Sequence, residues 1–142
     1  MTHPLLMDTD TLQERLGQPG LVIIDVRGKS AYEFGGHIPG AVHSTWHEYS
    51  DPNAIPKGLL NPDLAQIERQ LSALGISNDS EVVIYSNPFD NWGDEGRMFW
   101  MLEYLGHQNL KVLDGGWVKW TAEKRPFGHG RDFNPVHRVA VL

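Results

Sequence analysis

The sequence contains no cysteine in its 142 residues. This absence excludes disulfide bonds, thiolate metal sites and thiol nucleophiles together. Any chemistry that the chain performs by itself must therefore use other side chains.

The sequence also lacks basic runs and long apolar runs. It has 12 lysines and arginines against 18 acidic residues, a formal charge of −6, so nothing would release counterions from a nucleic acid or hold an anionic membrane. No apolar run approaches the roughly 20 residues of a spanning helix, and residues 1–7 lack the charged and apolar regions of a signal peptide. We expect a cytoplasmic protein with no nucleic-acid or membrane partner, no cofactor and no metal.

The composition is that of one globular domain. Hydrophobic residues make up 40% and charged residues 21% of the chain, and a chain of this length buries a sufficient core without disulfides or a metal. Residues 1–125 carry the periodic patterns of a folded domain. Residues 126–142 show no periodicity and contain Pro126, Gly128, Gly130 and Pro135, which predicts a tail or an interdomain linker.

Helix and strand patterns alternate along the chain. Asp8 is placed to cap a helix over 9–16, and Pro62 is expected at the first position of a helix whose leucines and isoleucine recur every three to four residues before Gly75. Continuous β-branched runs predict buried strands. The strands are expected at 21–24, 81–85 and 110–113, and further helices at 95–105 and 117–123. This alternation predicts an α/β fold with a mostly parallel sheet.

The longest loop at a predicted strand end follows the strand 81–85, where ligands collect in open parallel sheets. Counted through Arg97, it has three acids and one cation, a sum of −3 + 1 = −2. An anion cradle needs glycine amides and a cation, whereas acids in the first turn of the next helix cap that helix, which is the interpretation we favour. The candidate loop and pocket residues are Ser86, Asn87, Asp90, Trp92, Asp94, Glu95 and Arg97.

Three other patterns have both a functional and a structural interpretation. Ser86 lacks the G-x-S-x-G elbow and an adjacent base that would make it a nucleophile. His43 and His47 have metal-ligand spacing only on a helix, and this segment is expected to be a short strand running into a turn. Asp25 and Arg27, just past a strand, are interpreted as an ion pair that fixes the loop.

Several motifs, taken together, resemble the rhodanese family over roughly residues 5–125. They are the run from Val22 to Arg27, the run from Tyr32 to Ala41 with its Gly-His-Ile-Pro-Gly-Ala core, and Leu113 to Trp117. The motif residues to which we assign structural roles are Asp25, Arg27, His37, Pro39, Gly40, Asp114, Gly115, Gly116 and Trp117. The resemblance implies a rhodanese-like, five-stranded, mostly parallel sheet with helices on both faces.

The same resemblance implies that active members open the loop after the central strand with a cysteine that carries sulfur as a persulfide. Ser86 occupies that place, and a serine hydroxyl is a poor sulfur acceptor because it stays protonated at neutral pH. The long acidic loop, with Arg97, Phe99 and Trp100 in the next helix, is similar to the non-catalytic N-terminal domain of tandem thiosulfate and mercaptopyruvate sulfurtransferases.

The sequence leaves three hypotheses open. The first is a non-catalytic structural, regulatory or protein-binding module, inactive by itself, whose partner is a second rhodanese domain or another protein. The second is an active thiosulfate sulfurtransferase captured with serine in place of cysteine at residue 86. The third is a phosphatase-like or nucleotide- or anion-binding α/β domain. Trp92 and the loop acids are the expected partner surface.

Overall fold

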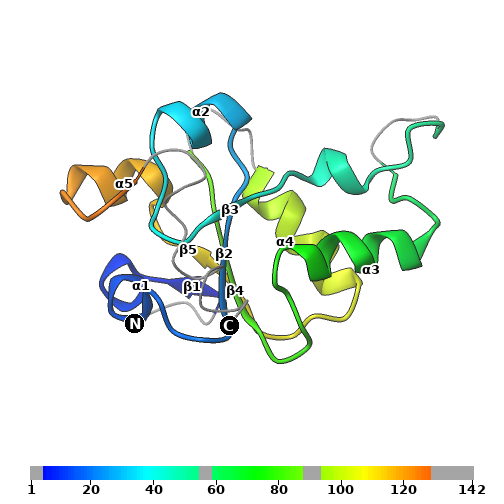
Figure 1. Cartoon of the computed structure of the whole chain (residues 1–142), viewed down its shortest axis with the longest axis horizontal. Coiled ribbons are helices and arrows are strands. Elements are labelled where there is room, and N and C mark those ends of the chain that lie inside the picture. Colours follow the sequence, from blue (N-terminus) through cyan, green and yellow to red (C-terminus); the bar gives the residue numbers. More distant parts are fainter. Residues whose placement is uncertain (1–4, 55–58, 88–93, 129–142) are drawn as a thin grey trace.

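A computed structural model describes residues 5–54, 59–87 and 94–128 of the chain. Its centre is a five-stranded sheet (Figure 1) in the order β1-β5-β4-β2-β3, with every neighbouring pair parallel. The strands are β1 (Leu6–Met7), β2 (Leu21–Asp25), β3 (Val42–His43), β4 (Glu81–Tyr85) and β5 (Leu110–Leu113). The predicted parallel α/β fold is confirmed.

The central strands are buried on both faces because helices cover both sides of the sheet. Along β4, Val82 and Ile84 face one apolar cluster, whereas Val83 and Tyr85 face the other. This alternation explains why the strands appear in the sequence as continuous apolar runs. Helices therefore lie on both faces, as expected.

The two helical layers are separate in Figure 1. One layer contains α3 (Leu64–Ala73), α4 (Asp94–Tyr104) and the short 3-10 helix η1 (Trp46–Tyr49), and the other contains α1 (Thr9–Arg15), α2 (Lys29–Phe34) and α5 (Gly116–Ala122). Because neighbouring strands are all parallel, their carboxyl ends lie together at one edge of the sheet.

The capping of α1 agrees with the sequence, and that of α3 does not. Asp8 accepts a hydrogen bond from the Thr11 amide at 2.7 Å, as predicted for an N-cap. Pro62 is not the first helical residue: Asp63 is the N-cap of α3, and its side chain accepts from the Gln66 amide at 3.2 Å. The Asp63 carboxylate supplies an acceptor for an amide of the first turn, so the helix begins at Leu64, two residues later than predicted.

α2 and β1 were not predicted from the sequence. α2 has no side-chain cap and buries only Tyr32, so neither of its ends carries a recognisable signal. β1 has two residues, Leu6 and Met7, which become a strand by pairing with β5. The short strand expected near His43 is present as β3 and leads into η1.

The first residues of the predicted tail pack on the domain. Trp120 donates its indole hydrogen to the Pro126 carbonyl at 2.7 Å, and Gly128 exchanges two backbone hydrogen bonds with His37. Contacts of the domain thus continue to residue 128, and the rest of the predicted tail lies outside the described residues. Within the described ranges, no helix is long and apolar enough to cross a membrane.

Candidate functional site

The carboxyl ends of the parallel strands gather several of the motif residues. Asp25 at the end of β2 pairs in register with His43 of β3 on one side and with Tyr85 of β4 on the other. This edge, where loops converge, is where open α/β sheets bind ligands. We therefore take it as the candidate site.

Ser86 follows β4 directly and is buried, with 2% of its surface exposed. Its backbone carbonyl accepts a hydrogen bond from the Trp117 amide at 2.9 Å, which ties the start of the loop to the turn before α5. Its hydroxyl has no hydrogen-bond partner within the part of the chain that the structure describes. Ser86 therefore meets no base there that would activate it as a nucleophile.

Asp25 and Arg27 form a buried ion pair beside Ser86. The Arg27 Nε and Nη2 atoms donate to the two Asp25 carboxylate oxygens at 3.0 and 2.6 Å, and Nη2 also donates to the Gly36 carbonyl at 2.6 Å. Burial disfavours the guanidinium charge, but the hydrogen bonds and charge of Asp25 outweigh it and raise the Arg27 pKa above its usual value. The Arg27 charge is thus committed to Asp25, as the structural interpretation expects.

Tyr85 completes this cluster, and the sequence analysis gave it no role. Its hydroxyl donates to Asp25 Oδ2 at 2.7 Å and accepts from the Ile38 amide at 3.1 Å. Burial, followed by the nearby Asp25 charge, raises the pKa of Tyr85 well above its usual value. A tyrosine at the end of one buried strand, directly opposite an aspartate at the end of the neighbouring strand, is the signal that could have revealed it.

The Gly-His-Ile-Pro-Gly-Ala segment forms a rigid turn under the ion pair. The Ala41 amide donates to the Ile38 carbonyl at 3.0 Å across Pro39 and Gly40, and Gly40 has φ 82°. Proline followed by a residue of positive φ is the requirement of a type II turn. These motif residues therefore shape the backbone.

The side chains around this turn are also engaged. His37 is fully buried, and its ring stacks on Tyr32 with 4.2 Å between ring centroids. Tyr32 donates to the Ala41 carbonyl at 2.6 Å, and burial raises its pKa to about 12. His43 Nε2 lies 2.6 Å from the Arg27 carbonyl, which can only accept, so this nitrogen donates.

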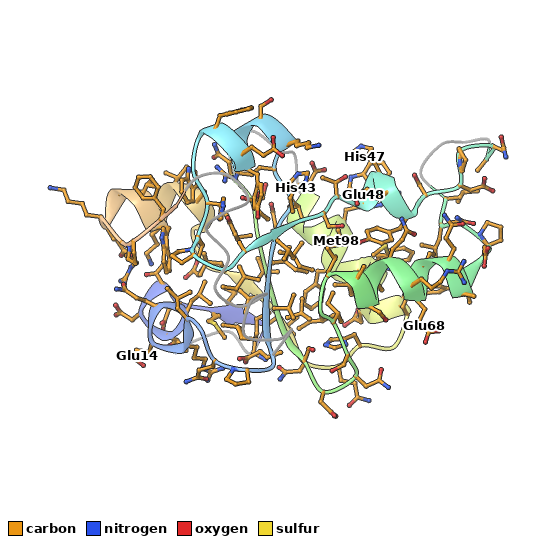
Figure 2. The ribbon with its side chains drawn as sticks, in the orientation of Figure 1. Glu14, His43, His47, Glu48, Glu68 and Met98 are labelled. Carbon is orange, nitrogen blue, oxygen red and sulfur yellow. The ribbon has the colours of Figure 1, made fainter. Side chains whose placement is uncertain are left out.

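His43 and His47 serve different contacts, as Figure 2 shows for the segment that leaves β3. His47 stacks on Trp46 in η1 with 3.8 Å between ring centroids, away from the His43 contact with Arg27. Among residues 5–54, 59–87 and 94–128, no group of three or more histidine, cysteine, aspartate and glutamate side chains comes together as a metal site.

The second glycine-rich motif connects β5 to α5. Gly115 has φ 82°, and a β-carbon there would lie 2.5 Å from Lys119 Cβ. Asp114 donates its amide to the Met7 carbonyl at 2.9 Å, and the Trp117 ring lies 4.4 Å from the Arg27 guanidinium carbon. This turn thus places the Trp117 ring against the Arg27 side of the Asp25–Arg27 pair.

The start of α4 carries the remaining loop candidates. Asp94 and Glu95 lie in the first turn of α4. Asp94 also accepts a hydrogen bond from the Trp46 indole nitrogen at 3.2 Å, and Arg97 lies over the same ring at 4.3 Å from its centroid. One Glu95 carboxylate oxygen is buried with no hydrogen-bond partner among the residues described. Asn87 follows Ser86 and has polar contacts of its own, whereas Asp90 and Trp92 lie outside the described residues.

A family model described as a rhodanese-like domain matches residues 8–123 of the chain. The chain is 32% identical over 126 residues to the sulfur carrier protein TtuD of Thermus thermophilus, aligning 87% of this chain with 42% of that protein. It is 33% identical over 128 residues to the thiosulfate sulfurtransferase of Azotobacter vinelandii, aligning 87% of this chain with 44% of that enzyme. The chain thus spans less than half the length of these curated relatives.

Solved structures give the same match. SseA from Escherichia coli, described as a 3-mercaptopyruvate sulfotransferase, superposes with a TM-score of 0.72 and 26% identity, covering 89% of this chain and 50% of that one. The Alr3790 protein from Anabaena superposes with a TM-score of 0.60 and 23% identity, covering 95% of this chain and 89% of that one. The second match, at this identity, concerns the fold alone.

Proposed function

The chain belongs to the rhodanese-like domain family, and we propose that it is a non-catalytic module of a sulfurtransferase, which works beside a separate domain that carries the sulfur-accepting cysteine. The observation that supports this proposal is the buried Ser86 directly after β4 in a chain with no cysteine.

The chemistry of sulfur transfer supports this proposal. A thiolate attacks the outer sulfur of thiosulfate, forms a new sulfur–sulfur bond and releases sulfite, and the persulfide then gives its sulfur to an acceptor. A serine hydroxyl is protonated at neutral pH and forms no persulfide. Ser86 therefore cannot take the part of the family cysteine.

The charges around Ser86 also oppose capture of an anionic sulfur donor. Arg27 is the only buried lysine or arginine among the described residues, and Asp25 already neutralises it. Asp94 and Glu95 open α4 with two negative side chains. An anion at this edge would gain no free positive charge from the Arg27 pair, because the Asp25 carboxylate already compensates it.

The size of the relatives supports a second domain. The thiosulfate sulfurtransferase of Azotobacter vinelandii has more than half of its length outside the region that matches this chain. We place the reactive cysteine of the working enzyme in a region of that kind. The role of this chain is then to pack beside that domain and shape its surroundings.

The test is a thiosulfate:cyanide assay of the purified chain, with the Azotobacter vinelandii enzyme as positive control. We expect thiocyanate at the level of the blank, and no sulfur retained on the chain after incubation with labelled thiosulfate. Thiocyanate formation that rises with chain concentration and survives repurification would refute the non-catalytic assignment.

A second candidate is supported by the Ser86 hydroxyl, which is buried and finds no hydrogen-bond partner among the described residues. A thiol is a weaker hydrogen-bonding group than a hydroxyl, so a cysteine would lose less than a serine in this buried position. The chain would then be a sulfurtransferase in which serine replaces the reactive cysteine at residue 86. Sequencing the encoding gene decides the matter, since a serine codon at that position ends this candidate.

A further inference from the structure

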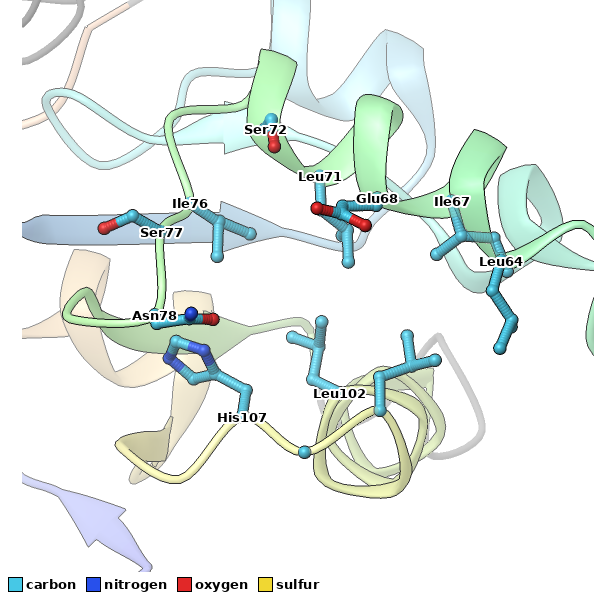
Figure 3. Close-up of a pocket in the computed structure, with 12 residues that line it drawn as sticks. Leu64, Ile67, Glu68, Leu71, Ser72, Ile76, Ser77, Asn78, Leu102 and His107 are labelled. Carbon is cyan, nitrogen blue, oxygen red and sulfur yellow. The ribbon is translucent and has the colours of Figure 1, made fainter.

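A groove lies between α3 and α4 at the edge of the sheet opposite Ser86 (Figure 3). Ser77 and Asn78, just before β4, and His107, just before β5, form one end of it. Its volume of about 570 Å³ falls within the roughly 300–1,000 Å³ of ligand-binding pockets. The lining residues are Leu64, Ile67, Glu68, Leu71, Ser72, Ile76, Ser77, Asn78, Leu102, Leu105, Gly106 and His107.

The floor of the groove is apolar. Ile67 of α3 and Leu102 of α4 are each 1% exposed and belong to the main core. Leu71 and Leu105 pack against the same core from the two walls, and Figure 3 shows the α3 side chains pointing toward α4. Leu64 stands at the open end with 54% of its surface exposed. An aliphatic side chain would bury apolar surface along this floor.

The polar side chains of the groove are Glu68, Ser72, Ser77, Asn78 and His107. Glu68 supplies a carboxylate. His107 Nε2 lies 2.8 Å from the Ser80 carbonyl, which only accepts, so Nε2 holds a hydrogen and donates it. None of the groove's lining residues is a lysine or arginine. Asp63 and Asp79 adjoin its two ends in the sequence.

We propose that this groove docks a basic amphipathic segment of a partner protein, with a leucine-like side chain on the floor and a lysine or arginine at Glu68. The groove is open along its length, because Leu64, Glu68 and Ser72 are all exposed. Such a shape fits an extended or helical segment laid between two helices. Charge complementarity selects a basic segment, and the formal charge of −6 favours its approach.

This docking site does not depend on sulfur chemistry. It lies at the amino ends of β4 and β5, whereas Ser86 and the Asp25–Arg27 pair lie at the carboxyl ends of the strands. Thiocyanate formation by the chain would refute the proposed function alone, and absence of peptide binding would refute the docking site alone.

The experiment measures binding of two matched helical peptides to the isotope-labelled chain by fluorescence anisotropy and by backbone NMR. Both peptides carry leucines on one face, and the other face carries lysines in one peptide and glutamates in the other. We expect the lysine peptide to bind, with shift changes confined to α3, the 74–79 turn and the end of α4, and the glutamate peptide to bind at least about tenfold more weakly.

Two variants locate the charge. Glu68→Lys should weaken binding of the lysine peptide about tenfold or more, because it replaces an attractive pair with a repulsive one. Glu103→Lys changes the same charge on an exposed position of α4 outside the groove, and we expect less than about a twofold change because exposed charges are screened by salt. Leu64→Ser, at the exposed end of the floor, tests the apolar contact and should weaken binding severalfold.

The proposal is overturned if the glutamate peptide binds as well as the lysine peptide, if the two lysine substitutions weaken binding equally, or if the shift changes map to the Ser86 edge. No binding of the lysine peptide at millimolar concentration also overturns it.

Discussion

The hydroxyl group of Tyr85, at the end of β4, donates a 2.7 Å hydrogen bond to Asp25 Oδ2, at the end of the neighbouring strand β2. The two residues are register partners in the sheet, and both are fully buried. Through Asp25, the hydroxyl is connected to Arg27 and so to the loop that follows β2. This small network organises the edge of the sheet at which Ser86 lies.

Tyr85→Phe is expected to destabilise the protein by about 1–3 kcal/mol, because the buried Ile38 amide loses its acceptor and Asp25 loses a donor. Urea unfolding measures the change. Tyr104→Phe removes a hydroxyl from a residue that is 66% exposed and should stay within about 0.5 kcal/mol of the parent. Equal effects of the two substitutions would contradict the network.

Asp25→Asn should cost about 3–5 kcal/mol, because it leaves the buried Arg27 guanidinium without its counter-charge. The control is Asp10→Asn, which breaks a surface pair with Arg125 in which the Asp10 side chain is 81% exposed and should cost less than about 1 kcal/mol. Denaturant midpoints compare the two variants, and a loss for Asp25→Asn as small as that of the control would speak against a buried pair.

Ser86→Ala should leave the free energy of unfolding unchanged to within about 0.5 kcal/mol, or raise it, since it removes a buried hydroxyl that has no partner in the described part of the chain. Ser44→Ala is the matched comparison: the buried Ser44 Oγ lies 2.6 Å from the Tyr49 hydroxyl, and its loss should cost about 1–3 kcal/mol. Similar losses for both variants would mean that Ser86 has a partner.

Ser86→Cys should remain poorly active in the thiosulfate:cyanide assay. A reactive thiolate needs nearby positive charge or free amides to lower its pKa, whereas Arg27 is paired with Asp25 and α4 begins with Asp94 and Glu95. The rate of iodoacetamide labelling against pH reports the thiol pKa directly. Robust cyanide-dependent sulfur transfer by this variant would overturn the view that the site is inactive, and would favour the second candidate function.

Stability should decrease at alkaline pH because three tyrosines are buried. Burial raises the pKa of Tyr32 and Tyr49 to about 12 and that of Tyr85 well above its usual value. The unfolded chain loses these protons near pH 10, while the folded chain keeps them, so stability is fully present below about pH 10 and is lost as pH rises toward the folded pKa values.

The urea midpoint measured between pH 9 and pH 12 tests this expectation. Each tyrosine adds a slope of about 1.4 kcal/mol per pH unit above pH 10. Tyr49→Phe should therefore remove about one third of the slope, and an unchanged slope would show that Tyr49 ionises equally in both states.

Much of the architecture was predictable because its signals are local. The buried runs at β2, β4 and β5 and the Asp8 cap of α1 appear in the sequence as they appear in the structure. β1 and α2 were missed because one is two residues long and the other lacks a capping side chain. The start of α3 was misplaced because proline and aspartate, both acceptable at a helix start, stand side by side.

The position of the candidate site was predicted, but the contacts between its residues were not. The motifs identified Asp25, Arg27 and Ser86, and the structure places all three at one edge. The Tyr85–Asp25 bond, the Trp46–Asp94 bond and the Trp117 contact with Arg27 join residues that are far apart in the sequence. No periodicity encodes such pairs, since they depend on how strands and helices are brought together.

The sequence by itself determined that this protein has no thiol, that its strands are buried on both faces, and that it belongs with the rhodanese-like domains, since composition, periodicity and motifs are all properties of the chain. Only the tertiary structure decided that Ser86 is buried, that Arg27 is neutralised by Asp25, and that a largely apolar groove with the carboxylate of Glu68 opens between α3 and α4. The physical reason is that burial and electrostatic pairing arise between elements, so they exist only after the elements have packed.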